Sequence, residues 1–315
     1  MKKIVVLGGG TGQSTLLRGL KLFPIDISAV VSVCDDGRST GRLREEFNIF
    51  AVGDIRQVIV SLSTTEPLFE ELLNYRFQTT SDLNGHAVGN LLLTALGNIT
   101  GNMQEGIETI GKVLNIKGKV LPFTLESPTL IGKMQDGSIV KGEHNITECA
   151  KKIDSVYYEN DVKVNPSVLR AVEEADLIIL SMGSLYTSVI PNLLSKELIR
   201  TIDQSKAKIM YVCNMMTQPG ETDDFKVSDH LNVLNSYLGN KKIEAIIANT
   251  GEIPKNILEK YETEEQKDQV IFDQENISDV EIITGNYVTI ENDIIRHKVS
   301  KLSVDIYSYL LEMGE

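Results

Sequence analysis

A glycine-rich loop near the N-terminus is the first segment whose residue types could do chemistry. The apolar run 4–7 predicts a strand that ends in this loop, and a helix is predicted over residues 14–22. Glycines let the backbone approach a phosphate, and the helix start directs its N–H groups there. Gln13 stands at the third glycine position of a dinucleotide fingerprint, and no Gly-Lys-Ser/Thr follows as in a P-loop. A tight strand-to-helix turn is the alternative to the nucleotide or phosphate site that we predict. The predicted contacts are Gly8, Gly9, Gly10, Thr11, Gly12 and Ser14.

Two adjacent acids, Asp35 and Asp36, follow the second predicted strand at residues 28–33. An acid at that position hydrogen-bonds a ribose in dinucleotide-binding folds. Adjacent carboxylates could equally hold a divalent ion that bridges phosphates. An Asp-rich turn without a ligand is the third possibility. The surrounding glycines, hydroxyls and arginines favour a ligand, so both acids are candidates for catalysis and metal binding, and Asp36 also for nucleotide binding.

Other polar clusters stand at predicted strand ends and helix starts. His86 lies in a glycine-bracketed loop, which makes it a candidate general base or phosphate partner, with a structural hydrogen bond as the alternative. Asp54 fits the N-cap of a predicted helix. Polar loops also follow the predicted strands 176–180 and 208–212. The further predicted nucleotide or phosphate contacts are Asn90, Gly183, Ser184, Thr187, Asn214 and Thr217.

The elements that must position these residues alternate along the chain. Continuous apolar strands, each followed by a loop and a helix, indicate a parallel sheet covered on both faces. We therefore predict a single α/β domain over residues 1–315, Rossmann-like and doubly wound, with a mainly parallel sheet. A small β-rich insertion is expected at about 118–158, beginning with a strand at 120–123, and a C-terminal extension at about 270–315. Helices are predicted at 55–62, 67–77, 87–98, 104–114, 168–174, 229–237 and 299–311.

The composition limits the partners of the chain. Its 315 residues carry 31 Lys and Arg against 44 Asp and Glu, a formal net charge of −13, which disfavours nucleic acid. Three cysteines without a CxxC pair fit a reducing cytosol better than a disulfide scaffold or a zinc site. No apolar stretch approaches a membrane span of about 20 residues. We expect a soluble, cytoplasmic protein without membrane insertion, and a homodimer is a further expectation.

Six ordered motifs together resemble one family. They are GGGTGQSTLLRGL, VSVCDDGRSTGRLR, GDIR, GHAVGNLLL, GSLYTSVIPNLL and NMMTQPGET, and they resemble the YvcK/CofD-like family. The last motif is most similar to the YvcK branch, the gluconeogenesis factors. That resemblance implies a Rossmann-like binder of UDP-sugars such as UDP-N-acetylglucosamine or UDP-glucose, without an established reaction. It also implies a role in cell shape and wall synthesis during gluconeogenic growth, with regulatory protein partners that are unknown. The nucleotide-sugar contacts that it implies are Tyr261 and Arg296.

The CofD branch of the same family leaves an enzyme open. It transfers a phospholactate group from a nucleotide-activated donor to a deazaflavin with a divalent metal, so Mg²⁺ would be the implied cofactor. The chain departs from the family motifs at Arg38, where a glycine is usual, and at Ser181-Met182, where Gly-Pro is usual. Arg38 would narrow the pocket or add a phosphate contact. Both departures argue against a catalytic activity more than against nucleotide binding. A non-catalytic UDP-sugar binder is therefore the first hypothesis, a metal-assisted transferase the second, and an NAD-type dinucleotide binder the third.

Overall fold

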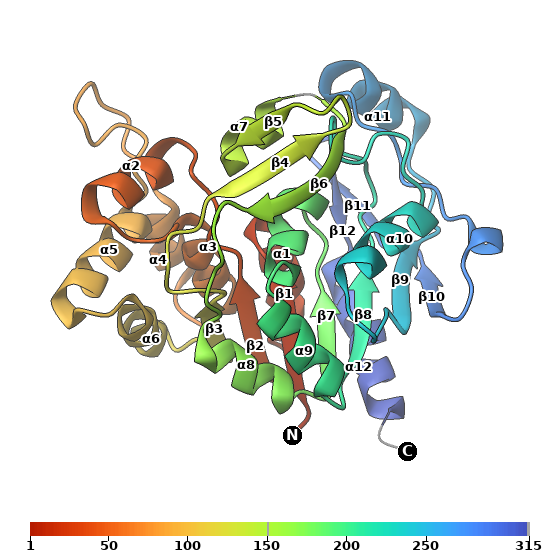
Figure 1. The fold of residues 1–315 in the computed structure, drawn as a ribbon, viewed down its shortest axis with the longest axis horizontal. Helices are drawn as coiled ribbons and strands as arrows, with labels where there is room; N and C mark the ends of the chain where they lie inside the picture. Colours follow the sequence, from red (N-terminus) through yellow and green to blue (C-terminus); the bar gives the residue numbers. More distant parts are fainter. Residues whose placement is uncertain (150, 314–315) are drawn as a thin grey trace.

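One parallel sheet of seven strands forms the centre of the protein (Figure 1). In this computed structural model, residues 1–149 and 151–313 are described, without the side chain of Arg38. The strand order is β10-β9-β8-β7-β1-β2-β3, and all neighbouring pairs are parallel. The Rossmann-like α/β prediction is thereby confirmed. The strands are β1 (Lys3–Gly8), β2 (Asp26–Val31), β3 (Lys119–Pro122), β7 (Leu177–Leu180), β8 (Lys208–Val212), β9 (Ala245–Asn249) and β10 (Glu281–Gly285).

The order of the strands reverses beside β1. The chain runs outward from β1 through β2 to β3, and then returns to place β7 on the other side of β1. Leu7 is accordingly paired with Val30 on one side and Leu180 on the other. In an open α/β sheet, such a reversal leaves a crevice at the carboxyl ends of the two strands. The glycine loop and the loop after β7 both begin there.

Strand alternation divides the interior into two apolar layers. Val6 points into one layer and its neighbours Val5 and Leu7 point into the other, as the period of two requires. The first layer is covered by helices that include α1, α3 and α12, and the second by helices that include α8, α9 and α10. These helices are α1 (Gly10–Leu20), α3 (Gly53–Leu62), α12 (Val299–Glu312), α8 (Pro166–Glu173), α9 (Lys196–Gln204) and α10 (Val227–Tyr237).

Helices between β2 and β3 form a lobe on one flank of the sheet, on the left in Figure 1. They include α2 (Arg38–Phe47), α4 (Pro67–Asn74), α5 (Val88–Thr100) and α6 (Met103–Val113). The sequence analysis did not predict α2, because Leu43 and Phe47 are its only apolar side chains. Leu43 is nevertheless buried, and it anchors the helix on the lobe.

The β-rich insertion is a separate antiparallel sheet above the carboxyl ends of the central strands (Figure 1). It consists of β4 (Leu130–Met134), β5 (Ile139–Lys141) and β6 (Ile153–Tyr158), with α7 (Glu143–Glu148) between β5 and β6. The strand predicted at 120–123 does not belong to it. That strand is β3, which pairs with β2 at the edge of the central sheet.

The C-terminal segment completes the fold instead of extending it. β10 adds an edge strand to the central sheet, and α12 packs against α1. Between them, β11 (Val288–Glu291) and β12 (Ile294–His297) form a hairpin outside the sheet, opposite α11 (Lys255–Lys260). Within the described residues, none of the helices combines the length and the apolar character that crossing a membrane requires.

Candidate functional site

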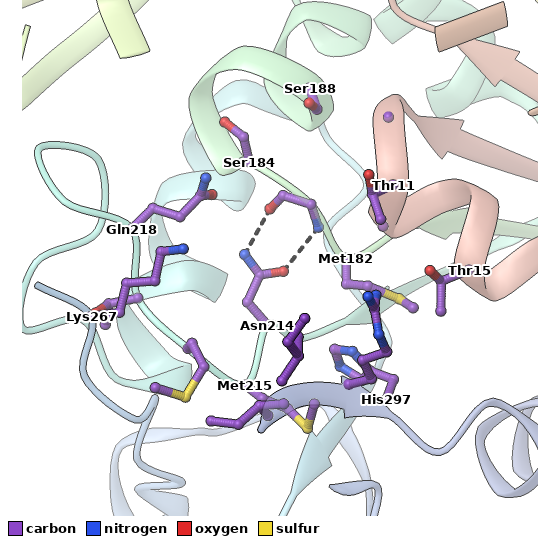
Figure 2. A pocket seen from close by; sticks show the side chains of 18 of the residues that line it. Thr11, Thr15, Met182, Ser184, Ser188, Asn214, Met215, Gln218, Lys267 and His297 are labelled. Carbon is purple, nitrogen blue, oxygen red and sulfur yellow. Dashed lines mark hydrogen bonds between the residues drawn. The ribbon is translucent and has the colours of Figure 1, made fainter. Parts of the chain in front are cut away.

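A cavity of about 460 Å³ opens at the carboxyl ends of β1, β7 and β8 (Figure 2). Its volume lies in the range of small-molecule sites. Glycines and hydroxyls line the part of the cavity beside α1, where Met182 also lies, and Met216, Ile295 and Tyr261 form an apolar cluster in another part of the lining. The lining residues are Gly9, Gly10, Thr11, Gly12, Thr15, Met182, Gly183, Ser184, Ser188, Asn214, Met215, Met216, Thr217, Gln218, Tyr261, Glu265, Lys267, Ile294, Ile295, Arg296 and His297.

The glycine loop supplies an open helix start. α1 begins at Gly10, whose φ is +59°, and no side chain caps its amino end. Apart from the Gly10 N–H, which bonds the carboxylate of Asp54, the first N–H groups of α1 are therefore left for water or a ligand. At Gly12, a Cβ atom would lie 2.0 Å from the carbonyl oxygen of Met182, so only glycine permits this approach. Gly9 through Gly12 line the cavity, whereas Gly8 and Ser14 lie beneath it and are buried.

Gln13 explains the departure from the dinucleotide fingerprint. Its side chain is fully buried, and its Nε2 donates to the carbonyl oxygens of Val6 at 2.8 Å and Val30 at 2.9 Å. It thus ties α1 to both β1 and β2. In dinucleotide-binding folds, the third glycine of the fingerprint lets the helix pack closely on the strand. Here the hydrogen bonds of the Gln13 side chain connect the helix to the strands instead.

Asn214 fixes the loop after β7. Its side-chain amide donates to the Gly183 carbonyl at 2.7 Å and accepts from the Gly183 N–H at 3.0 Å, the paired bonds drawn in Figure 2. Ser184 donates to the buried carboxyl of Glu221 at 2.6 Å and accepts from the N–H of Thr187 at 3.1 Å. Burial raises the pKa of Glu221. Ser184 faces the cavity, but Thr187 is buried behind it, in the π-helical turn Leu185–Val189.

A second loop brings a lysine to the cavity. Thr217 donates its N–H to the Asp268 carbonyl at 2.8 Å, and its hydroxyl accepts from the Asp268 N–H at 2.8 Å. These bonds hold the segment around Lys267 beside the loop after β8. The Nζ of Lys267 lies 2.6 Å from a carboxylate oxygen of Glu265. Figure 2 shows Lys267 and Gln218 on the same side of the opening.

The hairpin of β11 and β12 forms the remaining wall. The hydroxyl of Tyr261 accepts from the N–H of Ile295 at 3.0 Å, which joins the π-helical turn Tyr261–Glu265, directly after α11, to the hairpin. Arg296 lies at the mouth, with its side chain 43% exposed and its Nε 4.0 Å from Glu291. Burial lowers the pKa of His297 to about 4, so this imidazole is neutral at physiological pH. The Tyr261 and Arg296 predicted from the family resemblance therefore share one wall.

The charge of the cavity differs from that of the chain. Its charged lining residues are Lys267, Arg296 and Glu265, in a chain whose net charge is −13. Together with the uncapped start of α1, the two cations favour an anionic ligand. The apolar cluster in the lining suits a ring or an acyl group.

The predicted acids lie beside the cavity and do not line it. Asp36 accepts from the N–H of His144 at 2.9 Å, so it binds the insertion. Asp35 accepts from the Gly37 N–H at 2.9 Å and is coupled to Asp54 and Glu143. Among the residues that the structure describes, no three His, Cys, Asp or Glu side chains form a group that would hold a metal ion.

Asp54 is the acid that the sequence analysis assigned wrongly. Val52 is the N-cap of α3, so Asp54 lies in the first turn of the helix. A Cβ atom at Gly9 would lie only 2.8 Å from its carboxylate, which places Asp54 directly behind the glycine loop. Burial, and then the charge of Asp35, raise the pKa of Asp54 to about 7. Burial, and then Asp35, likewise raise the pKa of Glu143 to about 8.

His86 and Asn90 belong to a buried network in the helical lobe. The Nδ1 of His86 is hydrogen-bonded to the Ser39 hydroxyl at 2.7 Å. The side-chain Oδ1 of Asn90 accepts from Arg56 Nε at 2.9 Å, and Asn90 Nδ2 has no partner in the described structure. Burial lowers the pKa of Arg56 to about 10. Neither His86 nor Asn90 lines the cavity.

The cavity gathers ten of the predicted contacts and leaves seven outside. Within its lining are Gly9, Gly10, Thr11, Gly12, Gly183, Ser184, Asn214, Thr217, Tyr261 and Arg296. Outside it are Gly8, Ser14, Asp35, Asp36, His86, Asn90 and Thr187. Lys267 and the methionines were not predicted. Of the two departures from the family motifs, Met182 lines the cavity, whereas the side chain of Arg38 lies outside the part that is described.

The fold and the site define a Rossmann-like α/β protein with a cationic cavity at the reversal of strand order. The family model described as 2-phospho-L-lactate transferase CofD matches residues 4–288. The chain belongs to this CofD/YvcK family, as the motifs indicated. It is 45% identical over 310 residues to a gluconeogenesis factor of Bacillus subtilis (strain 168), covering 96% of this chain and 98% of the relative.

Other relatives agree in sequence and in structure. A gluconeogenesis factor of Halalkalibacterium halodurans is 44% identical over 305 residues, covering 96% of this chain and 94% of the relative. A crystal structure of a Bacillus halodurans protein superimposes with a TM-score of 0.94 at 44% identity. That comparison covers 97% of this chain and 99% of the other. The similarity therefore extends over the cavity and the C-terminal hairpin.

Proposed function

We propose that the cavity binds a UDP-sugar, such as UDP-N-acetylglucosamine or UDP-glucose, without turning it over. The observation that carries this proposal is the uncapped start of α1 facing Lys267 and Arg296 across one cavity. N–H groups at a helix start and two cations suit the diphosphate. The apolar wall around Tyr261 suits the base or the sugar ring.

The proposal extends to the role of the protein in the cell. The relatives in Bacillus subtilis and Halalkalibacterium halodurans carry the name gluconeogenesis factor. We infer by likeness to them that this chain acts in the cytoplasm, during growth on gluconeogenic carbon, and supports cell shape and wall synthesis. A protein partner that recognises the nucleotide-loaded form would connect binding to that role.

Isothermal titration calorimetry tests the binding directly. UDP-N-acetylglucosamine and UDP-glucose should each give saturable heat with one site per chain. Arg296→Gln should weaken binding by roughly 10–100-fold, as expected for the loss of a hydrogen bond to a charged group. Arg200→Gln, in another exposed arginine outside the cavity, serves as the matched control. No saturable heat with either sugar nucleotide would refute the proposal.

A metal-assisted transferase is the second candidate, and the coupled acids favour it. Asp54 lies behind the glycine loop and Asp35 lies near it, beside Gly53, and each would supply one carboxylate to Mg²⁺, with further ligands from substrate phosphate and water. Such an ion would act as a Lewis acid on the phosphoryl oxygens. The Gly10 N–H, which bonds Asp54, would hold that carboxylate in place.

Asp54→Asn separates the two candidates in one titration. A binder that needs no metal should hold the UDP-sugar equally well or more tightly, because a negative charge behind the glycine loop is removed. A Mg²⁺-dependent transferase should lose both metal-dependent affinity and phospholactate-type transfer to a deazaflavin. The hypothesis of an NAD-type dinucleotide binder stays a prediction. Retention of NAD instead of uridine nucleotides during purification would favour it.

A further inference from the structure

One acid lines a cavity that otherwise favours anions. Among the described residues of the lining, Glu265 is the single carboxylate, in company with the cations Lys267 and Arg296. The side chain of Glu265 is 47% exposed, so a ligand in the cavity can reach it. A carboxylate at this place repels the diphosphate of the proposed ligand. Phosphate binding alone therefore does not explain why the cavity contains an acid.

The turn that carries Glu265 is anchored to the cavity wall. Residues Tyr261–Glu265 form a π-helical turn, and the N–H of Lys267 donates to the Tyr261 carbonyl at 3.2 Å. The side chain of Tyr261 is buried, and its hydroxyl accepts from the N–H of Ile295 in the hairpin. π-Helical turns often occur at functional sites. The position of Glu265 is thus set by the same tyrosine that joins this turn to the hairpin.

Glu265 and Lys267 place an acceptor and a donor side by side. A carboxylate oxygen of Glu265 lies 2.6 Å from the Nζ of Lys267. Figure 2 shows Lys267 on the opposite side of the cavity from Thr11 and Thr15 of α1. A diphosphate that spans from the start of α1 to Lys267 would therefore bring an adjoining sugar close to Glu265.

Two polar side chains that were predicted to hold the ligand are committed to the protein. The Ser184 hydroxyl donates to Glu221 at 2.6 Å, lies 2.6 Å from the Thr187 hydroxyl and accepts from the Thr187 N–H at 3.1 Å. A hydroxyl has one proton and two lone pairs, so these three contacts use its whole capacity. Asn214 uses its amide to donate to Gly183 and to accept from it. Neither side chain is well placed to accept from a sugar hydroxyl.

Glu265 has the hydrogen-bonding capacity that those side chains lack. Lys267 is its carboxylate's one hydrogen-bond partner among the described residues, and an ionised carboxylate can accept about four bonds. In dinucleotide-binding folds, an acid accepts from a ribose hydroxyl, but Asp36, predicted for that role, contacts the insertion instead. We infer that Glu265 accepts from vicinal hydroxyls of a sugar that adjoins the diphosphate, while Lys267 contacts the phosphate. This inference rests on the proposed function, and the sugar is either the ribose or the hexose of the ligand.

The sign of one substitution separates this role from a purely electrostatic one. Glu265→Gln removes a negative charge from the cavity and releases Lys267 from its ion pair. If Glu265 does not touch the ligand, both effects favour tighter binding of an anion. If Glu265 accepts from sugar hydroxyls, UDP-glucose should bind roughly 10-fold more weakly, because a neutral amide oxygen replaces a charged acceptor.

Isothermal titration calorimetry of the full chain with three ligands tests the inference. Inorganic pyrophosphate has no sugar, so Glu265→Gln should bind it at least as tightly as the wild type does. UDP has the ribose alone, so weaker binding of both UDP and UDP-glucose identifies the ribose, and weaker binding of UDP-glucose alone identifies the hexose. Glu264→Gln, at the preceding exposed acid of the same turn and outside the lining, is the matched control and should change no affinity appreciably.

Two results would overturn the inference while leaving the proposed function intact. One is equal or tighter binding of UDP-glucose by Glu265→Gln. The other is an equal weakening for pyrophosphate, because Glu265 would then act only by positioning Lys267. A wild type that gives no saturable heat with UDP-glucose would refute the proposed function and this inference with it. Far-UV circular dichroism verifies that each variant is folded, as expected because an exposed ion pair contributes little to stability.

Discussion

Asp54→Asn should stabilise the protein at alkaline pH. Burial and the nearby charge of Asp35 raise the pKa of Asp54 from 3.8 to about 7. A carboxyl with a raised pKa binds its proton more tightly in the folded state, so ionisation costs stability as the pH rises from about 4 to about 7. Above that window the cost is constant. Asparagine avoids it and retains an oxygen for the Gly10 N–H.

The size of the effect follows from the shift. At about 1.36 kcal/mol per unit, a change from 3.8 to about 7 corresponds to an upper value of about 4 kcal/mol. Because Asp54 is only partly buried by accessible surface, we expect about 1–3 kcal/mol. At about pH 5, only the part of the shift between 3.8 and 5 acts, so the gain should fall to roughly 40% of its alkaline value.

Urea unfolding at about pH 5 and about pH 8.5 measures this difference in the free energy of unfolding. Asp82→Asn, at an exposed acid on a loop, is the control and should change stability little at either pH. If Asp54→Asn destabilises the protein at the higher pH, or changes the free energy of unfolding equally at both pH values, then the ionised Asp54 carboxylate does not cost stability as we infer.

Two substitutions and one pH titration test the cavity further. Asn214→Asp replaces the donor to the Gly183 carbonyl with a negative oxygen, so urea unfolding should show a loss of about 1–3 kcal/mol, and calorimetry weaker UDP-sugar binding. Gly12→Ala forces a Cβ atom against the carbonyl of Met182 and should abolish binding of the UDP-sugar in calorimetry; unchanged affinity would contradict the close approach. His297, with a pKa of about 4, should show no NMR titration step near 6.5, and its contribution to stability should be lost only as the pH falls from about 6.5 towards 4.

The sequence predicted the parts of the site that local patterns determine. Strand ends in a parallel sheet converge, so the glycine loop, Gly183 and Asn214 could be placed together without knowing a contact. Lys267 could not be found in this way, because its position depends on the bonds between Thr217 and Asp268, 51 residues apart. No spacing rule connects these two segments.

The acids illustrate the same limit. Asp35 and Asp36 are adjacent in sequence, which suggested a joint site, but adjacency in a loop does not determine which way each side chain points. Asp36 contacts the insertion at His144, while Asp35 is coupled to Asp54. The strand at 120–123 was assigned to the wrong sheet for a related reason: an apolar run predicts a strand but does not identify its neighbour.

The position of β1 between β2 and β7 has a consequence for synthesis on the ribosome. Leu7 can pair with Val30 soon after both emerge, but its other neighbour, Leu180, is 173 residues further along the chain. At about 5–20 residues per second, translation takes roughly 10–35 s to cover that distance. During this interval the nascent chain exposes one edge of its first strand, with the glycine loop half built. The chain therefore completes its ligand crevice only late in translation, and until then that strand edge is open to wrong pairing.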